Sequence, residues 1–134
     1  LVGWGLSGIY AREVAERTTP LVRQVITLGT PINLTAPGQQ PCSMLRALQD
    51  KQGHLDPAVA LRLRQRPPVP CTSIYSMTDN AVPWQMCLQT ESLMSENVLV
   101  QASNHSQLAQ HPKVLEVITH RLAQSEDAWR PFDA

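Results

Sequence analysis

Short β-branched runs alternate with amphipathic stretches along this chain. Residues 23–28, 71–76 and 96–101 are such runs, and turn-forming residues follow them, which predicts three short strands. Residues 111–124 instead predict a helix, because their apolar side chains recur at helical spacing. The side chains in that repeat are Val114, Leu115, Ile118 and Leu122.

The first residues predict a strand, a turn and a helix in quick succession. Residues 1–4 are typical of the end of a strand, and a glycine-rich turn follows over 5–8. Residues 9–17 predict an amphipathic helix, which we expect to end before Pro20 because the residue before a proline is pushed out of the helical region. The chain starts with Leu1 and has no signal-peptide pattern, so we expect it to be a fragment of a longer protein.

The segment between the first two of these runs has a different composition. Residues 33–41 are rich in Pro, Gly and Gln, which is typical of a loop. Residues 43–51 and 56–64 predict two short helices. The second has a clear start signal, with Asp56 as its N-cap and Pro57 at its first position.

Strands that alternate with helices predict an α/β fold with a mostly parallel sheet, formed by one domain over residues 1–134. In such a sheet the loops that follow the strands gather at one edge, where ligands bind. Gly5, Asp79 and His105 each come shortly after a predicted strand, with His105 in a predicted loop over 103–105. We therefore expect these three residues to lie close together.

Composition removes several classes of function. The chain has 11 basic and 11 acidic residues, and this balance argues against a nucleic-acid partner. No apolar run approaches the roughly 18 residues of a transmembrane segment. The three cysteines lack the spacing of a zinc site, and we interpret His54, His111 and His120 as surface or helix-end residues, so no metal is expected. Nothing in the sequence indicates a cellular compartment.

Four segments of the chain resemble bacterial α/β-hydrolases of the lipase and acylhydrolase type. They are residues 3–13, 22–31, 74–80 and 129–132. The resemblance covers nearly the whole chain apart from Asn33 to Pro67. It implies a partial α/β-hydrolase fold with flanking helices, in which residues 33–67 form a short helical cap insertion.

The resemblance also implies a catalytic serine within G-W-S-L-G-G, followed in the chain by an acid and a histidine. Here the segment reads Gly3-Trp4-Gly5-Leu6-Ser7-Gly8, so Gly5 stands at the nucleophile position. Asp79 is then the implied acid, His105 the implied base, and the Leu6 N–H an implied oxyanion donor, with no cofactor. Ser7 stands where the family has a glycine for close packing of helix on strand, so we expect a small packing cost there.

Three hypotheses follow for function. The first is a hydrolase fragment, derived from an enzyme that acts on a carboxylic-ester or lipid-acyl substrate and inactive because its serine is missing. The second is a non-catalytic module that binds an acyl ligand, and the third is a weak esterase that uses Ser7 as a substitute nucleophile. A sheet that begins with the strand before Gly5 would also expose that strand as an edge, where self-association is expected.

Overall fold

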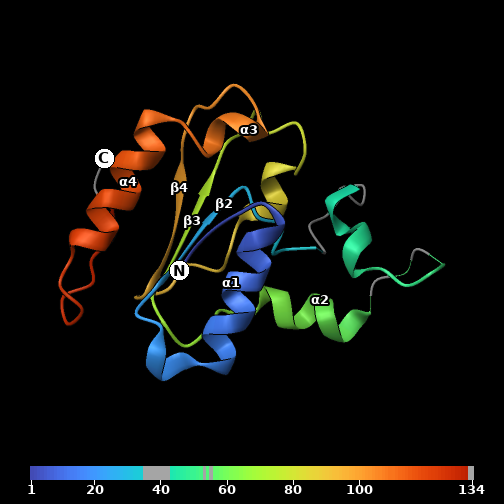
Figure 1. The fold of residues 1–134 in the computed structure, drawn as a ribbon, viewed down its shortest axis with the longest axis horizontal. Helices are drawn as coiled ribbons and strands as arrows, with labels where there is room; N and C mark the ends of the chain where they lie inside the picture. Colours follow the sequence, from blue (N-terminus) through green and yellow to red (C-terminus); the bar gives the residue numbers. More distant parts are fainter. Residues whose placement is uncertain (35–42, 53, 55, 133–134) are drawn as a thin grey trace.

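A computed structural model describes residues 1–34, 43–52, 54 and 56–132 of the chain. Its centre is a sheet of four parallel strands whose spatial order is the same as their order in the sequence (Figure 1). The strands are β1 (Val2–Trp4), β2 (Val25–Leu28), β3 (Cys71–Tyr75) and β4 (Ser95–Leu99). The parallel sheet predicted from the sequence is confirmed, and β1 and β4 are its two edges.

Helices flank this sheet on both sides, and Figure 1 shows α1 and α4 on opposite sides of the strands. The α-helices of the described residues are α1 (Leu6–Arg17), α2 (Pro57–Arg64), α3 (His105–Leu108) and α4 (Pro112–Ala123). Short 3-10 helices lie in the connections of this described part, η1 (Thr19–Leu21), η2 (Ser43–Leu48) and η3 (Trp84–Cys87). None of the helices in this described part has the length and apolar character needed to cross a lipid bilayer.

The sheet has a hydrophobic cluster on each face because successive side chains of a strand point to opposite sides. Ile26 and Leu28 of β2 belong to the cluster that includes Val114 and Val117 of α4. Val25 of β2 belongs to the other cluster, which is formed with α1 and β3. The remaining buried members of that second cluster are Ala11, Ala15, Val69 and Cys71. Both layers of helices therefore use the alternation of the same central strands.

Several predicted boundaries were wrong, and each has a local cause. The helix expected over 9–17 begins at Leu6, because the positive φ of Gly5 turns the chain directly from β1 into α1. His105 does not lie in a loop but begins α3, because the side chain of Asn104 accepts a hydrogen bond from the Gln107 N–H at 3.0 Å and caps the helix.

The remaining corrections concern shorter elements. The helix expected over 43–51 is the 3-10 helix η2. Strand β2 begins two residues later than predicted, and β4 begins one residue earlier and ends two residues earlier. The loop expected over 33–41 lies mostly outside the described residues. The predicted start of α2 is confirmed, since the Asp56 carboxylate accepts a hydrogen bond from the Ala58 N–H at 2.9 Å and Pro57 is the first helical residue.

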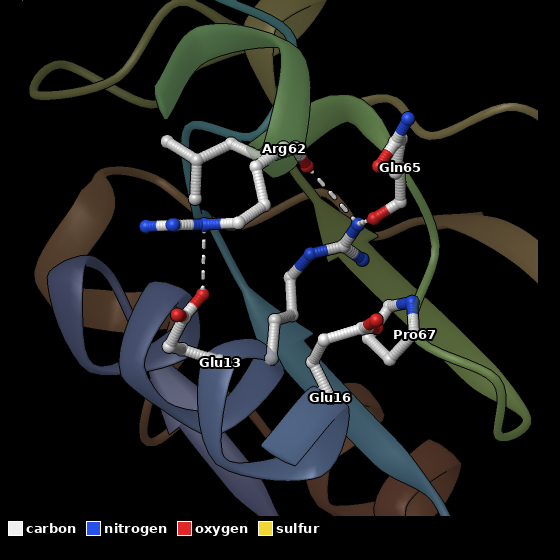
Figure 2. A pocket seen from close by; sticks show the side chains of 7 residues that line it. Glu13, Glu16, Arg62, Gln65 and Pro67 are labelled. Carbon is white, nitrogen blue, oxygen red and sulfur yellow. Dashed lines mark hydrogen bonds and ion pairs between the residues drawn. The ribbon is translucent and has the colours of Figure 1, made fainter. Parts of the chain in front are cut away.

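Helix α2 is attached to α1 through a buried arginine. The Arg12 guanidinium of α1 donates hydrogen bonds to the backbone oxygens of Leu63, at 3.1 Å, and Gln65, at 2.8 Å. An ion pair lies beside them, and Figure 2 shows Arg62 of α2 reaching Glu13 of α1, at 3.2 Å. These contacts hold α2 and the residue after it, Gln65, against α1.

Candidate functional site

Gly5 forms the turn between β1 and α1. Its backbone has φ 58° and ψ −127°, a combination in which a residue with a side chain is strained. The Gly5 N–H donates to the Leu28 oxygen at 2.8 Å, and the Thr30 hydroxyl donates to the Gly5 oxygen at 2.9 Å. Both bonds come from β2 or the residues directly after it, so the neighbouring strand holds the turn in place.

Asp79 and His105 form a buried pair at the same edge of the sheet. Asp79 lies in the turn after β3, and its Oδ2 is 2.8 Å from the Nδ1 of His105. The Asp79 Oδ1 accepts hydrogen bonds from the Ala81 and Val82 N–H groups, both at 2.9 Å. The side chain of His105 is 9% exposed and that of Asp79 is 1% exposed. Bulk water therefore has little access to this pair.

The electrostatics of the pair favour a charged carboxylate. Burial alone would raise the pKa of Asp79, but the hydrogen bonds from His105, Val82 and Ala81 together lower that pKa below its usual value. A charged acceptor at Oδ2 requires a proton on the Nδ1 of His105, which leaves the Nε2 of a neutral ring as an acceptor.

The Nε2 of His105 faces the backbone of Gly5. A Cβ atom placed on Gly5 would lie 3.1 Å from this nitrogen. The same Cβ would lie 3.2 Å from Cε and 3.4 Å from Sδ of Met44, whose side chain covers the turn. The structure thus brings together the three residues that were expected to share one edge of the sheet.

Leu6 and Ser7 are the first two residues of α1. The first N–H groups of a helix have no acceptor within the helix, so the Leu6 N–H next to Gly5 is available to a ligand. Ser7 is exposed, and its hydroxyl forms no hydrogen bond to any described residue. The structure therefore does not bring Ser7 to His105.

The prediction that Ser7 lies where the helix packs closely on the strand was wrong. The close contact of α1 with the residues that follow β2 lies one residue later, since a Cβ on Gly8 would come within 1.9 Å of the Thr30 Oγ1. Ser7 points to solvent because it follows the turn at a different angle around the helix, and an exposed hydroxyl does not disturb the contact between helix and strand.

Three residues near the pair were missed as site residues in the sequence. Asn80 accepts a hydrogen bond from the His105 N–H at 3.0 Å through its Oδ1, and Trp4 stacks on the His105 ring. Both stand next to predicted site residues, which was the available signal. Met44 had no such signal, because it lies in η2, which no motif of the sequence connects with Gly5.

The other histidines and the tryptophan Trp84 have partners of their own. His111 caps α4, with its Nδ1 accepting from the Lys113 N–H at 3.1 Å, and His54 pairs with Asp50 on the surface. Trp84 stacks on Tyr75 with ring centroids 6.0 Å apart. Within the described residues, no three His, Cys, Asp or Glu side chains are grouped to hold a metal ion.

No family model and no curated protein sequence matches the chain. Among solved structures it is similar to an alpha-beta serine hydrolase homologue from Coxiella burnetii, with 16% identity and a TM-score of 0.56 over 92% of this chain and 48% of that chain. It is also similar to one of LipS and LipT, two metagenome-derived lipolytic enzymes, with 14% identity and a TM-score of 0.57 over 89% of this chain and 62% of that chain. A third similar structure is the esterase domain of a Rhodothermus marinus protein, with 21% identity and a TM-score of 0.52 over 80% of this chain and 50% of that chain.

These neighbours are α/β hydrolases, and at such identities the likeness establishes the fold. The partial α/β-hydrolase fold expected from the sequence is confirmed. The chain spans about half to two thirds of the length of the structures that it matches.

Proposed function

We propose that this chain, with its partial α/β-hydrolase fold, carries the acid and base of an ester-hydrolase site from which the serine nucleophile has been lost. Asp79 would be the acid, His105 the base, and Gly5 the position of the missing serine. The observation that carries the proposal is the 3.1 Å between the Nε2 of His105 and a Cβ placed on Gly5. A hydroxyl on that Cβ would be within hydrogen-bonding reach of the base.

The chemistry that the site lacks is the first step of acyl transfer. A serine at position 5 would attack the ester carbonyl while His105 takes the hydroxyl proton, and Asp79 would hold the resulting imidazolium. The Leu6 N–H would donate to the oxygen that becomes negatively charged. Glycine has no oxygen for this attack, so the chain forms no acyl-enzyme intermediate.

The substrate class follows from the same comparison and from the cover of the site. The similar structures are described as lipolytic or esterase proteins, which points to a carboxylic ester or a lipid acyl group. Residues 33–67 were expected to form a cap, and we propose that the part around Met44 covers the site, whereas α2 packs on α1 around Arg12. The contact of Met44 with the Gly5 turn supports this, and a thioether side chain suits an apolar acyl group.

The test is labelling with a fluorophosphonate probe, which reacts with activated serines. We expect no labelling of the wild-type chain and labelling at position 5 in Gly5→Ser and in Gly5→Ser/Ser7→Gly. Addition of His105→Ala to Gly5→Ser should lower the labelling rate by about 100-fold or more, the contribution of a general base. Circular dichroism of each variant checks that it is folded.

Two outcomes would overturn the proposal. Labelling of the wild-type chain that disappears in Ser7→Gly would make Ser7 the nucleophile and the chain a weak esterase. A folded Gly5→Ser variant that does not react, or that reacts equally well without His105, would show that Asp79 and His105 do not form a working acid–base pair.

A further inference from the structure

We propose that Trp4 is a positioning residue that fixes the plane of the His105 ring, so that its Nε2 faces position 5. The importance of this for catalysis rests on the function proposed above. The contact of Trp4 with the ring does not rest on that function, and it can be tested in a chain that keeps Gly5.

Trp4 contacts His105 in two ways. The indole and imidazole rings are stacked, with centroids 5.1 Å apart and planes 26° apart. The indole Nε1–H also donates a hydrogen bond to the backbone oxygen of His105 at 3.1 Å. The polar atom and the ring face of one side chain are thus both directed at the same residue, which lies 101 positions away in the sequence.

The hydrogen bonds of His105 to Asp79 and Asn80 do not by themselves fix the plane of its ring. Asp79 holds the Nδ1 at 2.8 Å, and the Asn80 Oδ1 holds the backbone N–H at 3.0 Å. A hydrogen bond at Nδ1 fixes one atom, and the ring can still tilt about that atom, which swings Nε2 away from Gly5. Stacking against Trp4 removes this freedom because it fixes the plane of the ring.

Trp4 is poorly placed for a role in the core. It is the last residue of the edge strand β1, and its side chain is 42% exposed. Burial in the core therefore accounts for only part of its surface. Trp4 also directly precedes Gly5, so the strand that positions the vacant nucleophile site positions the ring support as well.

The first test uses fluorescence and needs no catalytic activity. Trp4, Trp84 and Trp129 are the tryptophans of the chain, so Trp84→Phe/Trp129→Phe leaves Trp4 as the only indole. A protonated imidazole quenches a stacked indole, so we expect Trp4 emission to undergo a downward transition as the solution is acidified. Addition of His105→Gln should abolish this transition. Emission that does not respond to pH, or that responds equally without His105, would overturn the proposal.

The second test measures fluorophosphonate labelling in the Gly5→Ser background. Trp4→Leu removes both contacts and should lower the rate by about 10- to 100-fold, the cost of a misplaced catalytic group. It should also change the pH profile of labelling. Trp4→Phe keeps an aromatic face and should retain a rate closer to that of the parent. The matched control is Trp129→Leu, which removes a tryptophan that lies against the Arg121 guanidinium, 5.6 Å from the ring centroid, and should change neither rate nor pH profile.

The two tests separate failure of this inference from failure of the proposed function. If Gly5→Ser does not react, the proposed function fails, and the fluorescence measurement still decides whether Trp4 stacks on His105. If Gly5→Ser reacts and Trp4→Leu, folded as judged by circular dichroism, reacts equally fast with the same pH profile, Trp4 is not a positioning residue. If Trp4→Leu does not fold, Trp4→Phe and the fluorescence titration carry the test.

Discussion

Asp79 is buried and accepts hydrogen bonds on both carboxylate oxygens, from His105 on one and from Ala81 and Val82 on the other. Its pKa in the folded chain is lower than in the unfolded chain. A carboxyl group with a lowered folded pKa stabilises the fold at pH values above its unfolded pKa. This stabilisation is lost as the pH falls through the folded pKa.

We therefore expect Asp79→Asn to reduce the free energy of unfolding by about 1–3 kcal/mol at pH 7, since it weakens hydrogen bonds to a buried charged group. The difference from wild type should shrink as the pH falls below about 3.9, the usual unfolded pKa of Asp. Urea unfolding at a series of pH values measures this difference in the free energy of unfolding, and Asp127→Asn is the exposed control. A difference of constant size across this range would contradict the linkage.

At the scale of elements, the joint between α1 and α2 depends on the buried side chain of Arg12, which is 4% exposed. Besides the Leu63 and Gln65 oxygens, its guanidinium donates to the Oε1 of Gln89 at 3.2 Å. It forms no ion pair with a carboxylate of the described residues, and burial lowers its pKa. Its hydrogen-bond acceptors are thus neutral oxygens, and the charge of Glu16 also favours the protonated guanidinium.

Arg12→Leu should lower the free energy of unfolding by about 2–4 kcal/mol, because several buried acceptors lose their donor at once. It should also speed cleavage by trypsin after Arg62 and Arg64, as α2 detaches from α1. Arg17→Leu is the control, since it removes an exposed ion pair with Glu13 that contributes less than about 1 kcal/mol. Unchanged stability of Arg12→Leu would show that the cost of burying the charge cancels its hydrogen bonds.

The type of most elements was predictable from the sequence, and their ends were less so. Asp56 and Pro57 marked the start of α2 correctly because an N-cap acts locally. The start of α1 was placed three residues late, because apolar spacing first becomes visible at Ile9 while the turn at Gly5 sets the actual start. His105 was placed in a loop although Asn104 before it was a usable N-cap signal.

For the molecule as a whole, the shared placement of Gly5, Asp79 and His105 could be predicted because parallel strands bring their carboxyl ends to one edge. The contacts of Met44 and Trp4 could not be predicted in this way. They depend on how a loop and an edge side chain pack in three dimensions, and no spacing along the chain records that. The acid and the base were expected from the resemblance to the hydrolases and from the order of these residues along the chain. The distances between them required the structure.

The edge strand β1 leads to a prediction about assembly. Its outer side has no strand partner among the described residues, and Leu1, Val2 and Trp4 are all more than two fifths exposed. We propose that the chain self-associates through this edge, and we expect sedimentation velocity to show larger species as concentration rises. Val2→Lys should reduce them, because a charged side chain on an edge opposes strand pairing.

Leu99→Lys at the opposite edge, β4, is the matched control and should have a smaller effect. A wild-type chain that stays monomeric at high concentration, or equal effects of the two lysines, would contradict assembly through β1.

The order of the strands also bears on how the sheet forms. Each strand pairs with the one that precedes it in the sequence, so the sheet can grow in one direction as the chain folds. The longest connection is the one from Leu28 to Cys71, which makes the docking of β3 on β2 the step that closes the largest loop. Because closure entropy rises only with the logarithm of loop length, at about 0.6 kcal/mol for each doubling, this interval can lengthen or shorten at a small cost in stability. Insertions or deletions between Leu28 and Cys71 are thereby uncoupled from the stability of the sheet.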